Sequence, residues 1–413
     1  MVVSVPIRVR NVETTHDAEQ FVRAVMRPFF ATDAEGERLA LNDRFRQEGT
    51  RFYLAEINDV VAGTFGSFDT AMSMPGGNDV DVDAITAVTV LGTHRRRGVL
   101  TEMMRVDLNA ARERSQAAAI LFAAEYPIYG RFGFGVANRP HSFTINKHTT
   151  AFARPESPAS ASGSVGYATP QDLLAIAPPL LDITRAQRGG DITRTPTKWD
   201  IECGVISWPH RPWKGWQAIS TDATGTPDGY ARWIVEERWD RSVPNSTLSV
   251  EALHATTSAA HERLWRFLFG LDLIATIKIS EIPCDDPLPW MLSNSRALVA
   301  ERDPDGLWLR VLDPLAMLKA RTLNDGAIDV AITDSLGYAE GLFRVEAGNV
   351  KRLRRRTSDL TMSVATFSTI ILGGERPDVL MRAGLIDEHR VGAAAALTNI
   401  LAVDAAPFTS MHF

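Results

Sequence analysis

The segment that most restricts the fold of this chain spans residues 88–100. It joins a β-branched run at 85–91 to an amphipathic pattern through a basic turn, Arg-Arg-Arg-Gly at 95–98. After the turn, apolar residues recur at helical spacing, at positions 100, 103, 104 and 108, and a second apolar run follows at 117–124. Strand, loop, helix and strand in this order predict a βαβ unit and a mixed α/β (α+β) chain.

The basic turn is suited to a phosphate-bearing ligand. A glycine at position 98 lets the backbone approach an anion closely, at a helix N-terminus where N–H groups point outward. The three arginines add forked, charged donors. The alternative is a solvated basic turn, but the position between a strand and a helix favours phosphate binding. Walker GxxxxGK[ST] and Rossmann GxGxxG patterns are absent from this turn.

Length and charge narrow the classes of protein. A single hydrophobic core rarely exceeds roughly 250–300 residues, so 413 residues predict two or three domains. The net charge of −6 argues against general nucleic-acid binding. Cys203, Cys284 and nine scattered histidines have no metal-site spacing, so no metal is expected. No apolar run approaches about 18 residues, which predicts no membrane span. Residues 1–10 do not resemble a secretory signal, which makes the cytoplasm the default location.

The order of elements suggests three segments. A polar turn at Asn58 and Asp59 between two apolar runs predicts a hairpin. Residues 154–166 are rich in Ser, Ala, Pro and Gly and are interpreted as a linker. The elements after residue 167 echo the first segment without its basic loop, so a second copy of the fold that lacks the ligand is expected. A third segment begins near residue 303.

Three motifs together resemble one family. They are Val-Thr-Val at 88–90, Thr-His-Arg-Arg-Arg-Gly at 93–98 and Ile-Tyr-Gly-Arg-Phe-Gly-Phe-Gly at 128–135. The set is similar to the enhanced intracellular survival (Eis) family of aminoglycoside N-acetyltransferases in the GNAT superfamily, and the resemblance covers the whole chain. It implies two tandem GNAT-fold domains, 1–153 and 167–300, followed by a sterol-carrier-protein-like α+β domain, 303–413. It also implies acetyl-CoA as cosubstrate, no metal and a homohexamer, and family members have been assigned roles outside the cell.

The resemblance also implies the site residues. Tyr129 corresponds to the general acid, and the C-terminal carboxylate of Phe413 to the general base. Cofactor contacts carry over to Val88, Thr89, Val90, Arg96, Arg97, Gly98, Val99, Leu100, Thr101, Ala124 and Glu125. The chain has Ala-Glu-Tyr-Pro at 124–127 where the family often has Ser-Glu-Gly-Gly. A serine contact is thereby lost, and Tyr126 becomes a second candidate acid. Without the resemblance, Tyr129 would be interpreted as a core aromatic residue and Phe413 as a frayed end.

Three functions remain open at this point. The first is acetylation of aminoglycoside amino groups at one or more positions. The second is acetylation of protein lysines or of polyamines. The third is a lipid-binding or assembly module with minor acetylation activity. A polycationic acceptor suggests aromatic and acidic side chains in its pocket, and the candidates are Phe29, Phe30, Trp290, Asp33 and Glu37. His412 lies next to the expected base in the sequence. Neither a nucleic-acid nor a membrane partner is expected.

Overall fold

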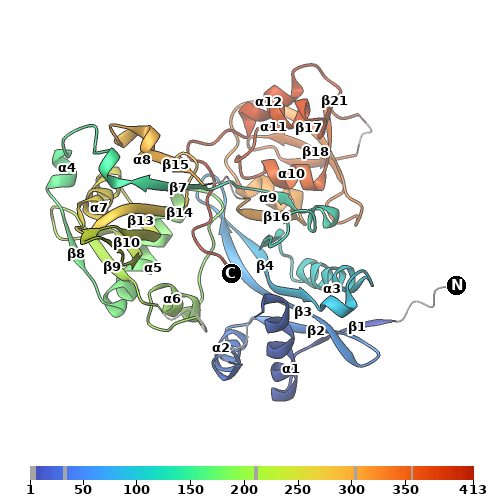
Figure 1. Cartoon of the computed structure of the whole chain (residues 1–413). Coiled ribbons are helices and arrows are strands. Elements are labelled where there is room, and N and C mark those ends of the chain that lie inside the picture. Colours follow the sequence, from blue (N-terminus) through green and yellow to red (C-terminus); the bar gives the residue numbers. More distant parts are fainter. Residues whose placement is uncertain (1–5, 31–34, 209–212, 302–304, 355–356) are drawn as a thin grey trace.

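The part of the chain that the structure describes folds into three large β-sheets and a two-stranded ribbon, with helices packed on the sheets (Figure 1). The structure is a computed structural model, and it describes residues 6–30, 35–208, 213–301, 305–354 and 357–413. This organisation agrees with the mixed α/β (α+β) class expected from the sequence.

The first sheet has the strand order β1-β2-β3-β4-β5-β16-β6. Its strands are β1 (Ile7–Asn11), β2 (Arg51–Ile57), β3 (Val60–Ser73), β4 (Asp79–Val90), β5 (Ala118–Phe122), β6 (Gly135–Val136) and β16 (Leu307–Val311). Its helices are α1 (Thr15–Met26), α2 (Glu35–Gln47) and α3 (Val99–Glu113). The predicted hairpin joins β2 and β3, with positive φ at both turn residues, Asn58 (52°) and Asp59 (60°). The predicted βαβ unit is β4-α3-β5.

The parallel strands β4 and β5 pair over a short stretch and then separate. Val82, Ala84 and the residue between them face 118–120, but β4 continues to Val90 against β3 alone. The β3–β4 register shifts near Gly66, where Ala87 has a φ of 50°. As a result, the edge of β4 that faces β5 has no strand partner in the described structure beyond Ala84.

The second sheet repeats this plan. Its order is β15-β7-β14-β13-β10-β9-β8, and its parallel pair β13–β14 encloses α7 as β4–β5 encloses α3. The elements are β7 (His141–Asn146), α4 (Pro158–Ala161), β8 (Ser164–Tyr167), α5 (Pro170–Gln187), α6 (Pro196–Glu202), β9 (Trp216–Thr221), β10 (Pro227–Glu236), β13 (Ser246–Ala255), α7 (Ser258–Gly270), β14 (Ile274–Ile282), α8 (Leu288–Met291) and β15 (Leu298–Ala300). The ribbon is β11 (Trp239–Asp240) and β12 (Val243–Pro244).

The third sheet follows in the last part of the chain. Its order is β19-β18-β17-β20-β21. The elements are α9 (Pro314–Ala320), β17 (Ala327–Thr333), β18 (Gly341–Glu346), β19 (Lys351–Leu353), β20 (Leu360–Ser363), α10 (Val364–Ile370), α11 (Pro377–Arg382), β21 (Ile386–Glu388) and α12 (Ala393–Ile400). One buried apolar cluster includes residues of this sheet and of the first sheet, so the two pack together.

Two strands cross the domain limits expected from the sequence. Strand β7 comes from 1–153 but pairs with β14 and β15 in the second sheet. Strand β16 comes from 303–413 but lies between β5 and β6 in the first sheet. A strand pattern shows that a segment is extended, but it does not identify the partner strand. The limits 1–153, 167–300 and 303–413 therefore do not coincide with the sheets.

The expected linker at 154–166 is also more ordered than predicted. It contains α4 and the start of β8, and it packs on α7. The Arg263 side chain donates from Nε to the carbonyl of Ser160 at 2.8 Å. The small and polar residues of segment 154–166 allow this close packing. The same composition is also typical of a flexible linker, which is why the sequence predicted one.

Candidate active site

The basic turn forms a cradle of backbone N–H groups at the start of α3. Arg96 (φ 62°) and Gly98 (φ 85°) both adopt left-handed conformations in the turn. Gly98 is the N-cap of α3, and no side chain caps the helix, so the N–H groups of the first turn are not used by a side-chain cap. Alternating backbone conformations and a helix N-terminus both favour an anion. The turn therefore fits a pyrophosphate.

The arginine side chains have different partners. Arg95 lies 3.5 Å from the Glu125 carboxylate, a contact between two exposed side chains that adds little stability. Arg96 and Arg97 are exposed, and neither has a carboxylate within 4.0 Å among the described residues. Their guanidinium groups therefore have no competing carboxylate to displace when a phosphate binds.

The edge of β4 continues the cradle. Val88 and Val90 are half-buried and pack, with Leu100 and Tyr129, against one apolar cluster. Thr89 is different, because its side chain is buried and its Oγ1 lies 2.6 Å from Thr64 Oγ1. A contact from Thr89 to a ligand would therefore come from its backbone. Thr101, Ala124 and Glu125 are exposed around the same cradle.

Tyr129 and Tyr126 occupy different environments. Tyr129 is 7% exposed and packs with its ring centroid 6.0 Å from Phe134 and 6.5 Å from Trp308. Burial, with a smaller contribution from the Glu125 charge, raises the pKa of Tyr129 to about 12. Its hydroxyl has no hydrogen-bond partner within the described part of the chain. Tyr126 is 55% exposed and packs edge-on against Trp308.

The C-terminal residue is held against the end of β5. The Phe413 ring centroid lies 5.2 Å from that of Phe122 and 5.5 Å from that of Phe68, both in edge-to-face geometry. His412 stacks on Phe122 at 3.9 Å, and its Nε2 lies 2.8 Å from a carboxylate oxygen of Glu281 in β14. The tail is therefore ordered by contacts with both the first and the second sheet.

Lys198 lies beside the ring of Phe413, and the sequence did not predict it as a site residue. Its Nζ is 4.4 Å from the ring centroid of Phe68, 5.6 Å from Phe45 and 5.7 Å from Phe413. Burial, reinforced by the positive charge of Arg194, lowers the pKa of Lys198 to about 7. No local pattern marks this lysine, because its neighbours at the site come from distant parts of the chain.

The expected acceptor residues are only partly brought together. Phe29 (60% exposed) and Phe30 (91% exposed) follow α1, and Glu37 is exposed on α2. Asp33 lies outside the described residues. Trp290 belongs to α8, on the side of the second sheet away from α1 and α2 (Figure 1). Within a single chain, Trp290 therefore does not lie near Phe29 and Phe30.

Comparisons with known proteins agree with this arrangement. Residues 8–137 and 190–311 each match an acetyltransferase (GNAT) domain, and residues 314–410 match a sterol carrier protein domain. The chain is 32% identical over 408 residues to an uncharacterized N-acetyltransferase of Streptomyces avermitilis, with 97% of each chain covered. The N-acetyltransferase Eis of Mycobacterium tuberculosis is 32% identical over 266 residues, covering 63% of this chain and 62% of that one. The crystal structure of Eis1 from Mycobacterium abscessus is 28% identical, with a TM-score of 0.85 over 99% of this chain and 100% of that one.

The chain belongs to the Eis family of GNAT N-acetyltransferases. This confirms the family resemblance, the two GNAT domains followed by a sterol-carrier-type domain, and N-acetyltransferase activity with acetyl-CoA as donor. None of the helices in the described part is both long and apolar enough to cross a membrane. In the same residues, no group of three or more His, Cys, Asp or Glu side chains is arranged to hold a metal ion.

The two GNAT domains differ at the cofactor end. Helix α7 of the second domain is the counterpart of α3, but Thr257 caps it by accepting from the backbone N–H of Ala260 at 3.1 Å. The turn between β13 and α7, Thr256-Thr257, has neither arginine nor glycine. These differences support the prediction that the second domain does not bind acetyl-CoA.

Proposed function

We propose that this Eis-family enzyme acetylates amino groups of aminoglycosides at one or more positions. The observation that carries the proposal is the position of Phe413, whose ring packs on Phe122 at the end of β5 while Tyr129 lies in the segment that follows. The proposed base is therefore at the end of β5, and the proposed acid belongs to the apolar cluster against which Val88, Val90 and Leu100 of the cradle pack. The chain's net charge of −6 favours a cationic acceptor.

The terminal carboxylate of Phe413 would accept a proton from the acceptor. An amine is mostly protonated near neutral pH and must lose a proton before it attacks a carbonyl. A free α-carboxylate has a pKa of about 3.3–3.7, which makes it a weak base in water. The rings of Phe68 and Phe122 hold the Phe413 ring in edge-to-face contact, which fixes the residue that carries the carboxylate.

The Tyr129 hydroxyl would act on the departing sulfur. When bound, acetyl-CoA supplies the acetyl group as an activated thioester. A pKa of about 12 keeps the Tyr129 hydroxyl protonated at neutral pH, so it is available as a donor. Because a thiol has a pKa of about 8.5, the hydroxyl stabilises the sulfur mainly by a hydrogen bond before proton transfer is complete.

The cradle would hold acetyl-CoA as the family resemblance implies. Open N–H groups of α3, with Arg96 and Arg97, are suited to the pyrophosphate. The β4 edge at 88–90 offers backbone groups that can pair with the pantetheine amides like an added strand. These proposed roles are supported by the donor groups that the turn and the strand offer and by the family resemblance.

Turnover with kanamycin tests the acceptor. The purified protein is incubated with acetyl-CoA and kanamycin, and the release of free thiol is followed. We expect multiple turnovers, and no release with any aminoglycoside would contradict the proposal. Parallel reactions with spermidine and with a lysine-containing peptide test the second candidate, acetylation of polyamines or protein lysines.

A C-terminal extension tests the base. Adding Gly-Ser after Phe413 moves the carboxylate away while the Phe413 ring stays in the chain. We expect kcat to fall by at least about 10²-fold, as for loss of a general base, with acetyl-CoA affinity unchanged. Undiminished turnover would exclude the terminal carboxylate as the base.

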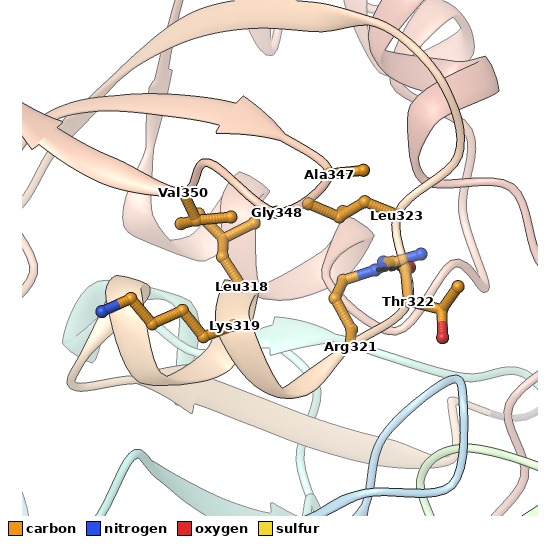
Figure 2. A pocket seen from close by; sticks show the side chains of 8 residues that line it. All are labelled: Leu318, Lys319, Arg321, Thr322, Leu323, Ala347, Gly348 and Val350. Atoms are coloured by element: carbon orange, nitrogen blue, oxygen red, sulfur yellow. Dashed lines mark hydrogen bonds between the residues drawn. The ribbon is translucent and has the colours of Figure 1, made fainter.

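A pocket in the third domain bears on the lipid-binding alternative. This cavity has a volume of about 450 Å³. Figure 2 shows the side chains that line it, which are Leu318, Lys319, Arg321, Thr322, Leu323, Ala347, Gly348 and Val350. The buried Arg321 already donates to the carbonyls of Ile371, Leu401 and Thr322. Its donors are thus engaged within the protein, which favours a structural role. Binding of a fluorescent fatty acid that Leu318→Trp blocks would support the lipid-binding alternative instead.

Assembly and location remain predictions of the sequence and the family resemblance. We propose a homohexamer, which sedimentation analysis would test. For location we propose the cytoplasm, and secretion, as suggested for the family, is the alternative. Cell fractionation distinguishes the two.

A further inference from the structure

The second GNAT domain contacts the C-terminal tail over several consecutive residues. The segment between α5 and α6 runs beside residues 406–410. Phe408 donates its backbone N–H to the carbonyl of Gly189 at 3.0 Å. Thr409 donates from Oγ1 to the carbonyl of Gly190 at 2.6 Å and accepts from Asn138 Nδ2 at 3.0 Å.

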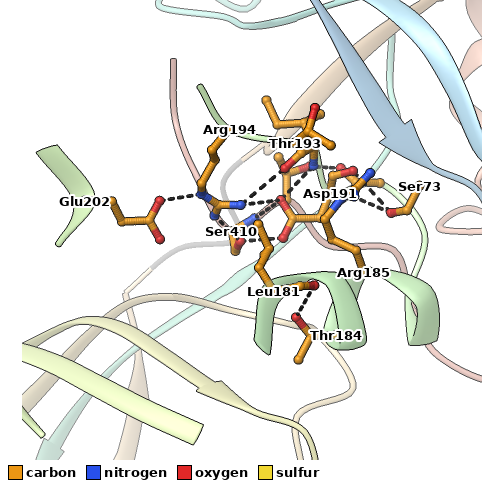
Figure 3. Close-up of polar contacts among 12 residues, drawn as sticks. Ser73, Leu181, Thr184, Arg185, Asp191, Thr193, Arg194, Glu202 and Ser410 are labelled. Atoms are coloured by element: carbon orange, nitrogen blue, oxygen red, sulfur yellow. Dashed lines mark hydrogen bonds and ion pairs between the residues drawn. The ribbon is translucent and has the colours of Figure 1, made fainter. Parts of the chain in front are cut away.

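Ser410 has the most elaborate contacts of the tail. Its hydroxyl donates to one oxygen of the Asp191 carboxylate, and its backbone N–H donates to the other oxygen at 3.2 Å. Arg194 donates from its guanidinium to the Ser410 hydroxyl at 2.8 Å. Figure 3 shows the side chains of Asp191 and Arg194 both turned toward Ser410.

Arg194 is itself held in place. Its side chain is fully buried, and its guanidinium pairs with Glu202 of α6 and donates to the carbonyl of Ile192 at 3.2 Å. A buried arginine held by a carboxylate has little freedom to change rotamer. Ser410 is therefore fixed by groups that are themselves rigid.

We propose that the second domain acts as a tail clamp, in which Asp191 and Arg194 are positioning residues for the terminal carboxylate. This rests on the proposed role of Phe413 as base. Chain ends are normally mobile, and the three residues beyond Ser410 can reach about 10 Å. A base must lie within hydrogen-bond distance of its proton, and a misplacement of about 1 Å can cost about 10²-fold in rate. The tail clamp restricts the movement of the terminal carboxylate. A GNAT domain that is predicted to lack acetyl-CoA would then still contribute to catalysis.

Asp191→Asn and Ser410→Ala test the clamp against a matched control. The control is Asp228→Asn, which alters another buried carboxylate of the second domain. Asp228 accepts from Ser220 Oγ at 2.7 Å and from Arg263 at 3.0 Å, and it has no contact with the tail in the described structure. All three variants lose hydrogen bonds to a buried group, so comparable losses in Tm are expected.

Two measurements distinguish positioning from general destabilisation. The first is the rate at which carboxypeptidase A releases Phe413 from the folded protein, and the second is kcat with KM for acetyl-CoA. For Asp191→Asn and Ser410→Ala we expect release at least about 10-fold faster and kcat about 10- to 100-fold lower, with KM unchanged. Asp228→Asn should change neither quantity, and Ser410→Thr, which keeps the hydroxyl, should restore both.

Each other outcome has a definite meaning. Unchanged release and kcat in the clamp variants would overturn the tail clamp but leave the terminal base intact, provided that the Gly-Ser extension abolishes turnover. Faster release with unchanged kcat, together with an active Gly-Ser extension, would overturn the proposed base and the positioning role with it. Equal effects in Asp228→Asn would also overturn the positioning role, because the effect would then be general destabilisation.

Discussion

At the scale of single residues, burial distinguishes the two tyrosines near the end of β5. Tyr129 is almost enclosed and Tyr126 is more than half exposed, although they are only three positions apart. Tyr129→Phe removes the hydroxyl and keeps the ring, so we expect kcat to fall by about 10²-fold with little change in acetyl-CoA affinity. Tyr126→Phe should stay within about 2-fold of the wild type. Thiol-release kinetics measure both variants, and equal losses would contradict the assignment of Tyr129.

Lys198 predicts a pH dependence of stability. Its pKa is lowered to about 7 in the folded protein, whereas an unfolded lysine has a pKa of about 10.4. Between these two pKa values, Lys198 is protonated in the unfolded chain and mostly neutral in the folded protein. The free energy of unfolding of the wild type therefore rises as the pH increases from the lower to the higher pKa. Lys198→Met removes the effect, and it should therefore be more stable than the wild type near pH 7.

Urea denaturation at pH 7 and pH 9 measures this difference. The advantage of Lys198→Met should shrink by on the order of 2 kcal/mol between the two pH values, since one pKa unit corresponds to about 1.36 kcal/mol. Lys278→Met changes an exposed lysine of β14 and serves as the matched control. A constant difference for Lys198→Met would contradict the lowered pKa.

At the scale of elements, the glycines of the 128–135 motif differ in how closely neighbouring atoms pack against them. A Cβ on Gly135 would lie 2.1 Å from the carbonyl oxygen of Ala365, so this glycine allows α10 to approach β6. A Cβ on Gly133 would lie 2.7 Å from Arg310 Nε. A Cβ on Gly130 would meet nothing within 4 Å of the described atoms. The motif that suggested a catalytic site therefore also serves the docking of the third domain.

Gly135→Ala should destabilise the protein without removing the site. Because the backbone of α10 must move, we expect a loss of about 1–3 kcal/mol in the free energy of unfolding, as for overpacked cores. Gly130→Ala, in the same motif, should lie within about 0.5 kcal/mol of the wild type. Thermal denaturation measures both variants, and acetyl-CoA binding at low temperature should be retained in each. A larger loss for Gly130→Ala would reverse this assignment.

Local patterns predicted the elements well, but not their partners. The hairpin at Asn58 and the unit β4-α3-β5 depend on neighbours close in sequence, so turn residues and helical spacing were sufficient. Likewise, Gly98 marked the start of α3 because a left-handed residue is needed there. The sites of Lys198 and Ser410 depend on contacts between residues more than 100 positions apart, and no local pattern records such contacts.

At the scale of the whole molecule, strands β7 and β16 each complete a sheet built mainly from another segment of the chain, so the segments cannot be treated as independent domains. Strand β16 pairs along all of β5, from Leu307 opposite Phe122 to Val311 opposite Ala118. Within β16, Arg310 is fully buried and donates to both carboxylate oxygens of Asp334, at 2.8 and 2.9 Å. The first sheet is therefore completed by β16, which begins more than 180 residues after the end of β5. The Arg310–Asp334 ion pair also links β16 to the third domain.

Truncation tests this dependence. A chain that ends after Glu301 lacks β16, so it exposes the edge of β5 and the apolar residues that Trp308 covers in the full chain. We therefore expect aggregation and no measurable acetyl-CoA binding. A chain that ends after Ser410 keeps the three sheets and the tail clamp but lacks the terminal Phe413. It should bind acetyl-CoA as the full chain does, with turnover reduced by at least about 10²-fold. Circular dichroism and calorimetric titration compare the two proteins. If the chain ending after Glu301 folds and binds acetyl-CoA, β16 is dispensable and the sheets are independent after all.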